Sequence, residues 1–122
     1  VKYKRLKILI VEDDDTSALL LSVGLEEINK ETLYACNGAK AIEVCRENPD
    51  LDVILMDIKM PVINGYQATK EIRKFNKDVI IIAQTAYAFK DDKERAVESG
   101  CNDCVSKPIV MSRLIALIQK LC

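Results

Sequence analysis

The fold is constrained most by an alternation between two apolar patterns along the chain. Short runs rich in β-branched residues alternate with longer stretches in which apolar residues recur every three or four positions. The strand-like runs cover residues 6–11, 32–36, 53–56, 79–83 and 104–106. The helix-like stretches cover residues 16–29, 38–47, 64–75, 91–99 and 112–121. This alternation is typical of an α/β protein with a parallel sheet that helices cover on both faces.

Five βα units predict a doubly wound, five-stranded parallel sheet with the flavodoxin-like strand order 2-1-3-4-5, because crossovers between parallel strands are right-handed. With 122 residues, of which 49% are apolar, the chain can bury one substantial core. We therefore expect a single domain over residues 1–122, in which residues 1–5 form an N-terminal extension. Ligands of such sheets bind outside the carboxyl ends of the strands, so we expect functional residues there.

The composition excludes several classes of function. The 18 basic and 19 acidic residues nearly cancel, so no strong field favours binding to nucleic acid or to an anionic membrane. The apolar run at residues 79–83 is far too short to span a membrane. The chain contains no histidine, which excludes a histidine triad or a phosphohistidine within it. We expect a cytoplasmic protein, and Val1 in place of Met indicates a fragment of a longer polypeptide or a processed one.

Acidic residues cluster after the first and third strand-like runs. Glu12 and Asp13 directly follow the first run, and Asp57 follows the third. Central parallel strands would bring these carboxylates to one edge of the sheet, where a pair ~4 Å apart repels by about 4 kcal/mol at an effective dielectric near 20. A hard divalent cation would relieve this repulsion, and oxygen-only ligands select Mg²⁺, Mn²⁺ or Ca²⁺. Asp14 or Asp15 would instead cap the following helix.

A hydroxyl group and an ammonium group follow the last two strand-like runs. Thr85 comes after the fourth run, whereas Lys107 comes after the fifth and directly precedes Pro108. Together with the acidic cluster, these groups predict a site for a phosphoryl group at the carboxyl edge of the sheet.

Four segments together resemble one protein family. ILIVEDDD, VILMDIKMPVINGYQATKEIR, IIAQTAYA and GCNDCVSKPI are similar to segments of receiver domains of response regulators, which act in two-component signalling, and they stand in the same order. The resemblance covers nearly the whole chain. AQTAYA and GCNDCVSKPI resemble receivers attached to hybrid sensor histidine kinases more than those attached to DNA-binding regulators.

This resemblance implies a Mg²⁺-dependent phosphoacceptor rather than an enzyme, with Asp57 as the nucleophile and phosphorylation site. It implies that Asp13 and Asp57 bind Mg²⁺ through their carboxylates and Glu12 largely through water. Lys59 would contribute its backbone carbonyl to the same ion. Gly65, in the loop after the acceptor, would be free to adopt a positive φ.

The same resemblance implies a conformational switch. Lys107 would pair with one phosphoryl oxygen, and Thr85 would turn its hydroxyl toward another while the loop that begins at Ala86 moves. The family usually carries Tyr or Phe three residues before the lysine, and this chain carries Cys104, so we expect a modest shift. Tyr87 is bulky enough to shield the acyl phosphate from water.

The implied partner is a histidine kinase or a histidine phosphotransfer domain that docks as a helical bundle. By position in the family, its contacts would come from Ser17 and Leu20 on the first helix and from Pro108 and Ile109 after the last strand. A core role for Leu20 is nearly as well supported, because three leucines stand in succession there. We expect a monomer or weak dimer that contacts neither nucleic acid nor membrane. The parent protein could still be a membrane-anchored sensor kinase, of which this domain would be a cytosolic part.

Three other functions fit the residues less well. A phosphatase of the haloacid dehalogenase type normally needs a second Asp two positions after the nucleophile, where this chain has Lys59. A flavodoxin-like FMN module would need a Ser/Thr/Gly phosphate loop in place of the acidic residues 12–15. Cys101 and Cys104 have a spacing compatible with redox or zinc chemistry, but zinc needs two further ligands and a thioredoxin-like pair follows an early strand. The odd count of five cysteines indicates reduced thiols.

Overall fold

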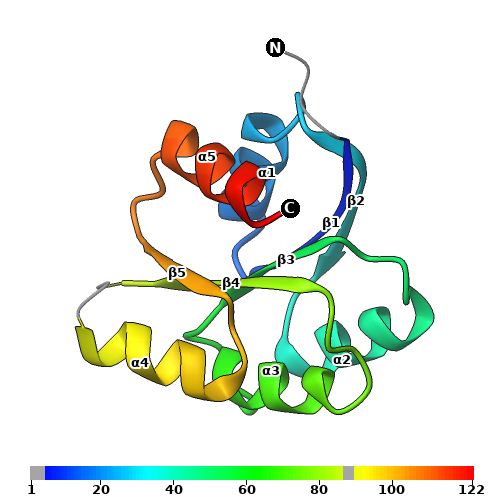
Figure 1. Cartoon of the computed structure of the whole chain (residues 1–122), viewed down its shortest axis with the longest axis vertical. Helices are drawn as coiled ribbons and strands as arrows, with labels where there is room; N and C mark the ends of the chain where they lie inside the picture. The colour runs from blue at the N-terminus through cyan, green and yellow to red at the C-terminus, as the bar shows by residue number, and fades with distance from the viewer. Residues whose placement is uncertain (1–4, 87–89) are drawn as a thin grey trace.

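The predicted alternation is present in the computed structural model, which describes residues 5–86 and 90–122. The strands are β1 (Leu6–Val11), β2 (Asn29–Ala35), β3 (Val53–Asp57), β4 (Ile80–Thr85) and β5 (Asp103–Ser106). The helices are α1 (Asp15–Gly24), α2 (Gly38–Glu47), α3 (Gly65–Arg73), α4 (Lys90–Ser99) and α5 (Met111–Leu121). The strands form one parallel sheet in the order β2-β1-β3-β4-β5, which confirms the predicted doubly wound, flavodoxin-like topology (Figure 1).

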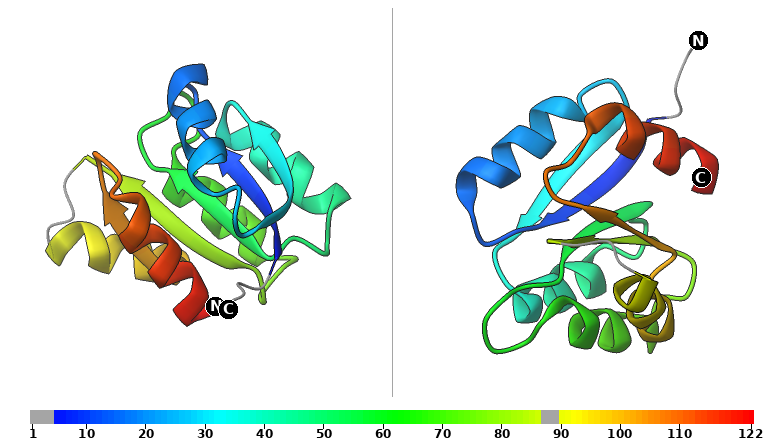
Figure 2. Two further views of the ribbon diagram at one scale, coloured as in Figure 1. Left: turned by 90° about the horizontal axis from the view of Figure 1, so that it is seen from above. Right: turned by 90° about the vertical axis from the view of Figure 1, so that its left-hand side faces the viewer.

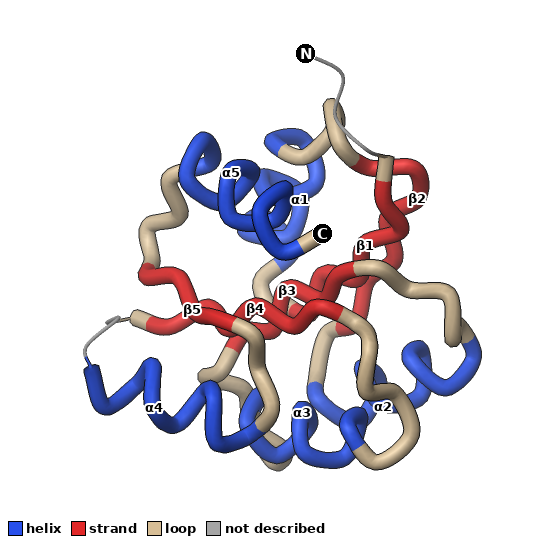
Figure 3. Tube along the Cα trace, viewed as in Figure 1, coloured by secondary structure: helices blue, strands red, loops and turns tan. Residues whose placement is uncertain are grey.

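Helices cover both faces of this sheet. α1 and α5 lie on one face, and α2, α3 and α4 lie on the other (Figure 3). The side chains of β1 alternate between the two faces, so one strand contributes to both cores. Ile8 and Ile10 pack in the core beneath α1 and α5, whereas Leu9 and Val11 pack in the core beneath the other three helices. All four are buried, which explains why this strand is apolar at nearly every position.

Because every strand pair is parallel, the carboxyl ends of the strands meet at one edge of the sheet, and Figure 2 shows this arrangement from two further directions. Within the described residues, no helix is long and apolar enough to cross a membrane. Tyr87 and most of the expected N-terminal extension lie outside the described residues.

The largest departure from the sequence prediction lies between α1 and β2. The predicted helix over residues 16–29 is too long, because α1 ends at Gly24 and β2 already begins at Asn29. Leu25 and Ile28 lie in the turns between them, and both are buried in the core beneath α1 and α5. Their spacing continues the helical period of α1 although the chain has left the helix, which explains the error. The polar first residues of β2 suit its position at the edge of the sheet.

Gly65 is required for space rather than for a positive φ, which corrects the expectation from the sequence. Among the described glycines only Gly100 has a positive φ, and in the loop after Asp57 the residue with a positive φ is Val62. A Cβ atom on Gly65 would collide with the backbone carbonyl oxygen of Asp57 and would lie 2.8 Å from Cα of Ile58. The start of α3 can therefore pack against the backbone of Asp57 and Ile58 only with glycine at this position.

We expect Gly65→Ala to lower the free energy of unfolding by about 2 kcal/mol, because the added methyl group meets backbone atoms that cannot move aside. Gly24→Ala is the matched control, since a Cβ atom there meets only the flexible side chain of Met111. It should cost less than about 1 kcal/mol. Urea denaturation of both variants measures the difference, and equal losses would contradict the packing explanation.

Candidate functional site

Acidic side chains from two neighbouring strands meet at the carboxyl edge of the sheet. Val11, the last residue of β1, pairs with Met56 of β3. The residue that follows each of them, Glu12 and Asp57, therefore lies beside the other. One carboxylate oxygen each from Glu12, Asp13 and Asp57 lies within 4.8 Å of the other two. Glu12 and Asp57 are buried, whereas Asp13 is exposed. The structure thus brings together the three carboxylates that the sequence analysis selected.

Lys107 reaches this cluster from the loop after β5. Its Nζ atom lies 3.3 Å from Oε2 of Glu12 and 3.4 Å from Oδ2 of Asp57. The other carboxylate oxygen of Asp57, Oδ1, accepts a 3.1 Å hydrogen bond from the backbone N–H of Lys59. The peptide bond between Lys107 and Pro108 is cis. Both oxygens of the Asp57 carboxylate therefore have positively polarised neighbours.

Negative charge exceeds positive charge in this cluster, because one ammonium group faces three carboxylates. Burial and the Asp57 carboxylate raise the pKa of Glu12, although Lys107 acts in the opposite direction. Burial lowers the pKa of Lys107, but the carboxylates of Asp57 and Glu12 outweigh burial, so the pKa lies above its ordinary value. The raised pKa of Lys107 thus reflects the surrounding negative charge, whereas that of Glu12 reflects burial first and the Asp57 carboxylate second. A set of oxygen ligands with excess negative charge fits Mg²⁺ or another hard divalent cation.

Asp14 has the capping role that the sequence left open between Asp14 and Asp15. Its Oδ2 atom accepts hydrogen bonds from the backbone N–H of Ser17 at 2.9 Å and from the Ser17 hydroxyl at 2.6 Å. This cap fixes the start of α1, and with it Ser17, beside the acidic cluster.

Thr85 is the last residue of β4 and is buried at the same edge. Its backbone carbonyl accepts a 2.8 Å hydrogen bond from the N–H of Lys107, so the threonine and the lysine are directly joined. Cys104 is partly buried and packs against the core beneath α2, α3 and α4. The loop expected to move with Thr85 is described only at Ala86, which is exposed.

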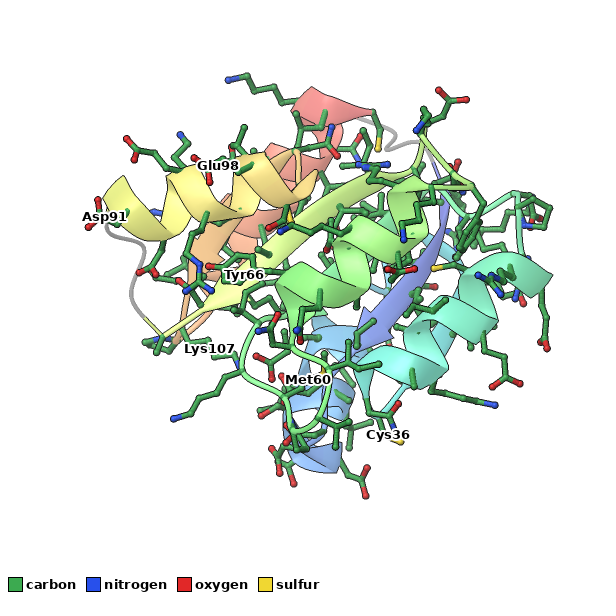
Figure 4. All side chains as sticks on the ribbon, turned by 90° about the horizontal axis from the view of Figure 1, so that it is seen from below. Cys36, Met60, Tyr66, Asp91, Glu98 and Lys107 are labelled. Atoms are coloured by element: carbon green, nitrogen blue, oxygen red, sulfur yellow. The ribbon has the colours of Figure 1, made fainter. Side chains whose placement is uncertain are left out.

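Tyr66 provides an aromatic ring beside Thr85 that the sequence analysis did not predict. Tyr66 is buried near the start of α3, and it lines a cavity of about 160 Å³ together with Thr85 and Ala86. The guanidinium group of Arg95 on α4 lies 4.6 Å from the centre of the Tyr66 ring, and Figure 4 shows Tyr66 between these two helices. The signal in the sequence was an aromatic residue directly after Gly65, at the start of an amphipathic helix.

A groove of about 350 Å³ opens beside the acidic cluster, between α1 and the loop after β5. Its walls include all four residues predicted to contact a partner, namely Ser17, Leu20, Pro108 and Ile109. Glu12 and Lys107 also line it, so the groove is continuous with the cluster. Leu20 is 66% exposed and Leu21 is 5% exposed, so Leu21 fills the core role that the sequence also allowed for Leu20. Gln84, in the strand sequence IIIAQT, lines the groove as well and was not predicted.

The pair Cys101 and Cys104 lacks the properties of a redox or zinc site. Neither cysteine forms a disulfide, and burial raises the pKa of Cys101 to about 11 and that of Cys104 above its ordinary value. Reactive and metal-binding cysteines need the opposite shift, because the thiolate is the active form. Among the described residues, the only group of three or more potential metal ligands is the acidic cluster.

Comparison with known proteins gives the family directly. Two-component system protein A of Emericella nidulans is 36% identical over 122 residues, which cover 95% of this chain and only 17% of that protein. The polar-differentiation response regulator DivK of Brucella anthropi is 37% identical over 115 residues, which cover 92% of each chain. A chain in the co-crystal structure of the Saccharomyces cerevisiae histidine phosphotransfer protein Ypd1 with the receiver domain of Ssk1 is 33% identical. It has a TM-score of 0.90, and the match covers 97% of this chain and 89% of that one.

The family model of the response regulator receiver domain matches residues 8–119, which include β2 to β5 in full, most of β1 and most of α5. The chain therefore belongs to the response regulator receiver domains of two-component signalling.

The buried thiols give a test of the packing around the site. At pH 8, iodoacetamide should modify the exposed Cys36 and Cys122 within minutes and leave Cys45 and Cys101 intact. Burial raises the pKa of Cys45 to about 12 and that of Cys101 to about 11, so neither forms thiolate at this pH. In urea all five cysteines should react. Mass spectrometry identifies the modified residues, and rapid labelling of Cys101 in the folded chain would contradict this packing.

Proposed function

We propose that this receiver domain accepts a phosphoryl group on Asp57 from a phosphohistidine of a histidine kinase or a histidine phosphotransfer domain, in a reaction that requires Mg²⁺. The observation that carries the proposal is the buried Asp57 carboxylate, which has Lys107 at 3.4 Å and two further carboxylates within 4.8 Å. A phosphoacceptor needs a nucleophile, a fixed cation and a place for a metal ion, and these residues supply all three.

In the proposed reaction, a carboxylate oxygen of Asp57 forms a bond to phosphorus while the bond between phosphorus and the partner's imidazole nitrogen breaks. The electron pair of the broken bond stays on the imidazole. Lys107 would follow the phosphoryl group and pair with one of its oxygens, and the Thr85 hydroxyl would bind another. The short distances from Lys107 to Asp57 and Glu12 mean that only a small movement of the ammonium group is needed.

Mg²⁺ would be held by the carboxylates of Asp13 and Asp57, by Glu12 largely through water, and by the backbone carbonyl of Lys59. The ion would supply positive charge that lets the phosphoryl dianion approach these carboxylates. The geometry supports this assignment, because three carboxylate oxygens lie within 4.8 Å of one another and a single ammonium group faces them.

We propose a modest switch in which Thr85, Ala86 and Cys104 report phosphorylation. Cys104 offers little volume for an inward movement, which supports a small rearrangement on the β5 side. The Tyr66 ring lines the same cavity as Thr85 and contacts Arg95 of α4, so a movement of Thr85 can reach that helix without a β5 aromatic residue.

We propose that the parent protein is a hybrid histidine kinase and that residues 1–122 form a single receiver domain within it, a monomer or weak dimer in the cytoplasm. The chain spans 17% of the length of two-component system protein A, which supports a longer parent, although the match to DivK covers 92% of both chains. In this arrangement the groove would receive the helical bundle of the partner. The likeness of this chain to a chain in the co-crystal structure of Ypd1 with the receiver domain of Ssk1 supports a phosphotransfer protein as that partner.

Phosphoramidate, a small donor with a P–N bond, should label Asp57 only when Mg²⁺ is present. Asp57→Asn should abolish the added phosphoryl mass, and EDTA should suppress it by at least about tenfold, because the carboxylates then repel the incoming dianion. Asp15→Asn, which removes an exposed carboxylate from the first turn of α1, is the control and should label normally. Equal labelling of Asp57→Asn and the native chain, measured by mass spectrometry, would overturn the assignment.

Leu20→Asp should slow transfer from phosphorylated Ypd1 by about tenfold or more, since it removes an apolar anchor at the groove and adds charge there. Labelling by phosphoramidate should be unchanged. Leu19→Asp is the matched control, because Leu19 is also 61% exposed on α1 but does not line the groove. If both variants slow transfer equally, the groove is not the docking surface.

A further inference from the structure

Gln84 is a polar residue in a buried strand whose four preceding residues are all apolar. In the sheet it lies between Asp57 of β3 and Val105 of β5, and only 2% of it is exposed. Within residues 5–86 and 90–122, neither Oε1 nor Nε2 of its side chain has a hydrogen-bond partner. A buried amide without partners destabilises a folded protein, so Gln84 calls for an explanation other than folding.

The side chain of Gln84 belongs to the floor of the groove. Side chains alternate along a strand, so Gln84 lies on the same face of the sheet as Ile82, which packs in the core beneath α1 and α5. Gln84 lines the groove together with Leu20 and Pro108. The groove therefore has both apolar and charged residues in its walls and, at its base, one amide with a donor and an acceptor still to be satisfied.

Other polar groups at this end of the sheet have partners of their own. Nζ of Lys107 lies 3.3 Å from Glu12 and 3.4 Å from Asp57. The backbone carbonyl of Gln84 itself accepts a hydrogen bond of 3.2 Å from the N–H of Ile58. Both amide atoms are closed off from solvent, so a partner reaches them only when docking into the groove moves the side chains that cover them.

We propose that Gln84 is a recognition residue for the phosphohistidine partner, whose docked helix places a hydroxyl or carboxamide side chain against the Gln84 amide. This inference rests on the proposed function, since the groove joins the acceptor site at Glu12 and Lys107. An amide both donates and accepts, so the complementary residues are Ser, Thr, Asn and Gln. A partner with an apolar residue there would leave the Gln84 amide unpaired in the complex and would be disfavoured.

A protein helix suits this groove better than a small metabolite. The exposed Leu20 at the rim matches the apolar face of a helix. The groove also shares Glu12 and Lys107 with the acceptor site, so its occupant lies where a phosphohistidine has to approach.

The test compares Gln84→Met with the native chain and with Gln119→Met. Methionine has nearly the volume of glutamine and lacks the amide. Gln119 also has a buried Nε2 without a partner among the described residues, but it lies on α5 away from the groove. Each chain is measured for its thermal midpoint, for labelling by phosphoramidate with Mg²⁺, and for phosphoryl transfer from phosphorylated Ypd1.

We expect Gln84→Met to raise the thermal midpoint by about 4 °C, to leave phosphoramidate labelling unchanged, and to slow transfer from Ypd1 by about tenfold. Gln119→Met should leave both reactions unchanged.

Unchanged transfer to Gln84→Met would overturn the inference, as water or a small molecule would then satisfy the amide. An equal loss of phosphoramidate labelling and of transfer from Ypd1 in Gln84→Met would also overturn it. The same holds if phosphoramidate labels the native chain but phosphorylated Ypd1 does not. If phosphoramidate fails to label even the native chain, the proposed function itself is wrong. Gln84→Leu repeats the comparison if the methionine variant does not fold.

Discussion

Balancing buried negative charge at the carboxyl edge of the sheet is the constraint on which the rest of the site depends. Glu12 and Asp57 are both buried, and a buried carboxylate is costly unless an opposite charge or hydrogen bonds compensate it. Lys107, which is 95 residues from Glu12 in the sequence, provides that charge. The short strand β5 matters for this reason, because Lys107 directly follows its last residue and so lies beside the two carboxylates. One ammonium group for three carboxylates leaves a deficit that a divalent cation can fill.

Most of the fold was predictable because the apolar pattern and the geometry of parallel sheets act together. Strands buried on both faces must be apolar throughout, and β1 and β4 meet that condition almost fully. Once the strand order follows from right-handed crossovers, the residues after each strand must meet at one edge. Glu12, Asp57 and Lys107 could therefore be grouped before any coordinates were known. The end of α1 was missed because Leu25 and Ile28 keep the helical spacing in a turn.

The features that the sequence does not reveal depend on contacts between segments that lie apart along the chain. Gly65 is needed because its Cα lies against the backbone of Asp57, a contact that no local pattern encodes. The ring of Tyr66 contacts Arg95 because α3 and α4 pack together on one face, and it lines a cavity with Thr85 at the end of β4. Gln84 stands out in its strand as a polar residue, yet its missing hydrogen bonds and its place in the groove become visible only in three dimensions.

A crystal structure with Mg²⁺ and beryllofluoride, a mimic of the phosphoryl group, tests the central role of Asp57 most directly. We expect beryllium joined to a carboxylate oxygen of Asp57 and Mg²⁺ beside Asp13. Nζ of Lys107 should have left Glu12 for a fluorine atom, and the Thr85 hydroxyl should contact another. If beryllofluoride binds elsewhere while Lys107 keeps its present distances to Glu12 and Asp57, Asp57 is not the phosphoacceptor.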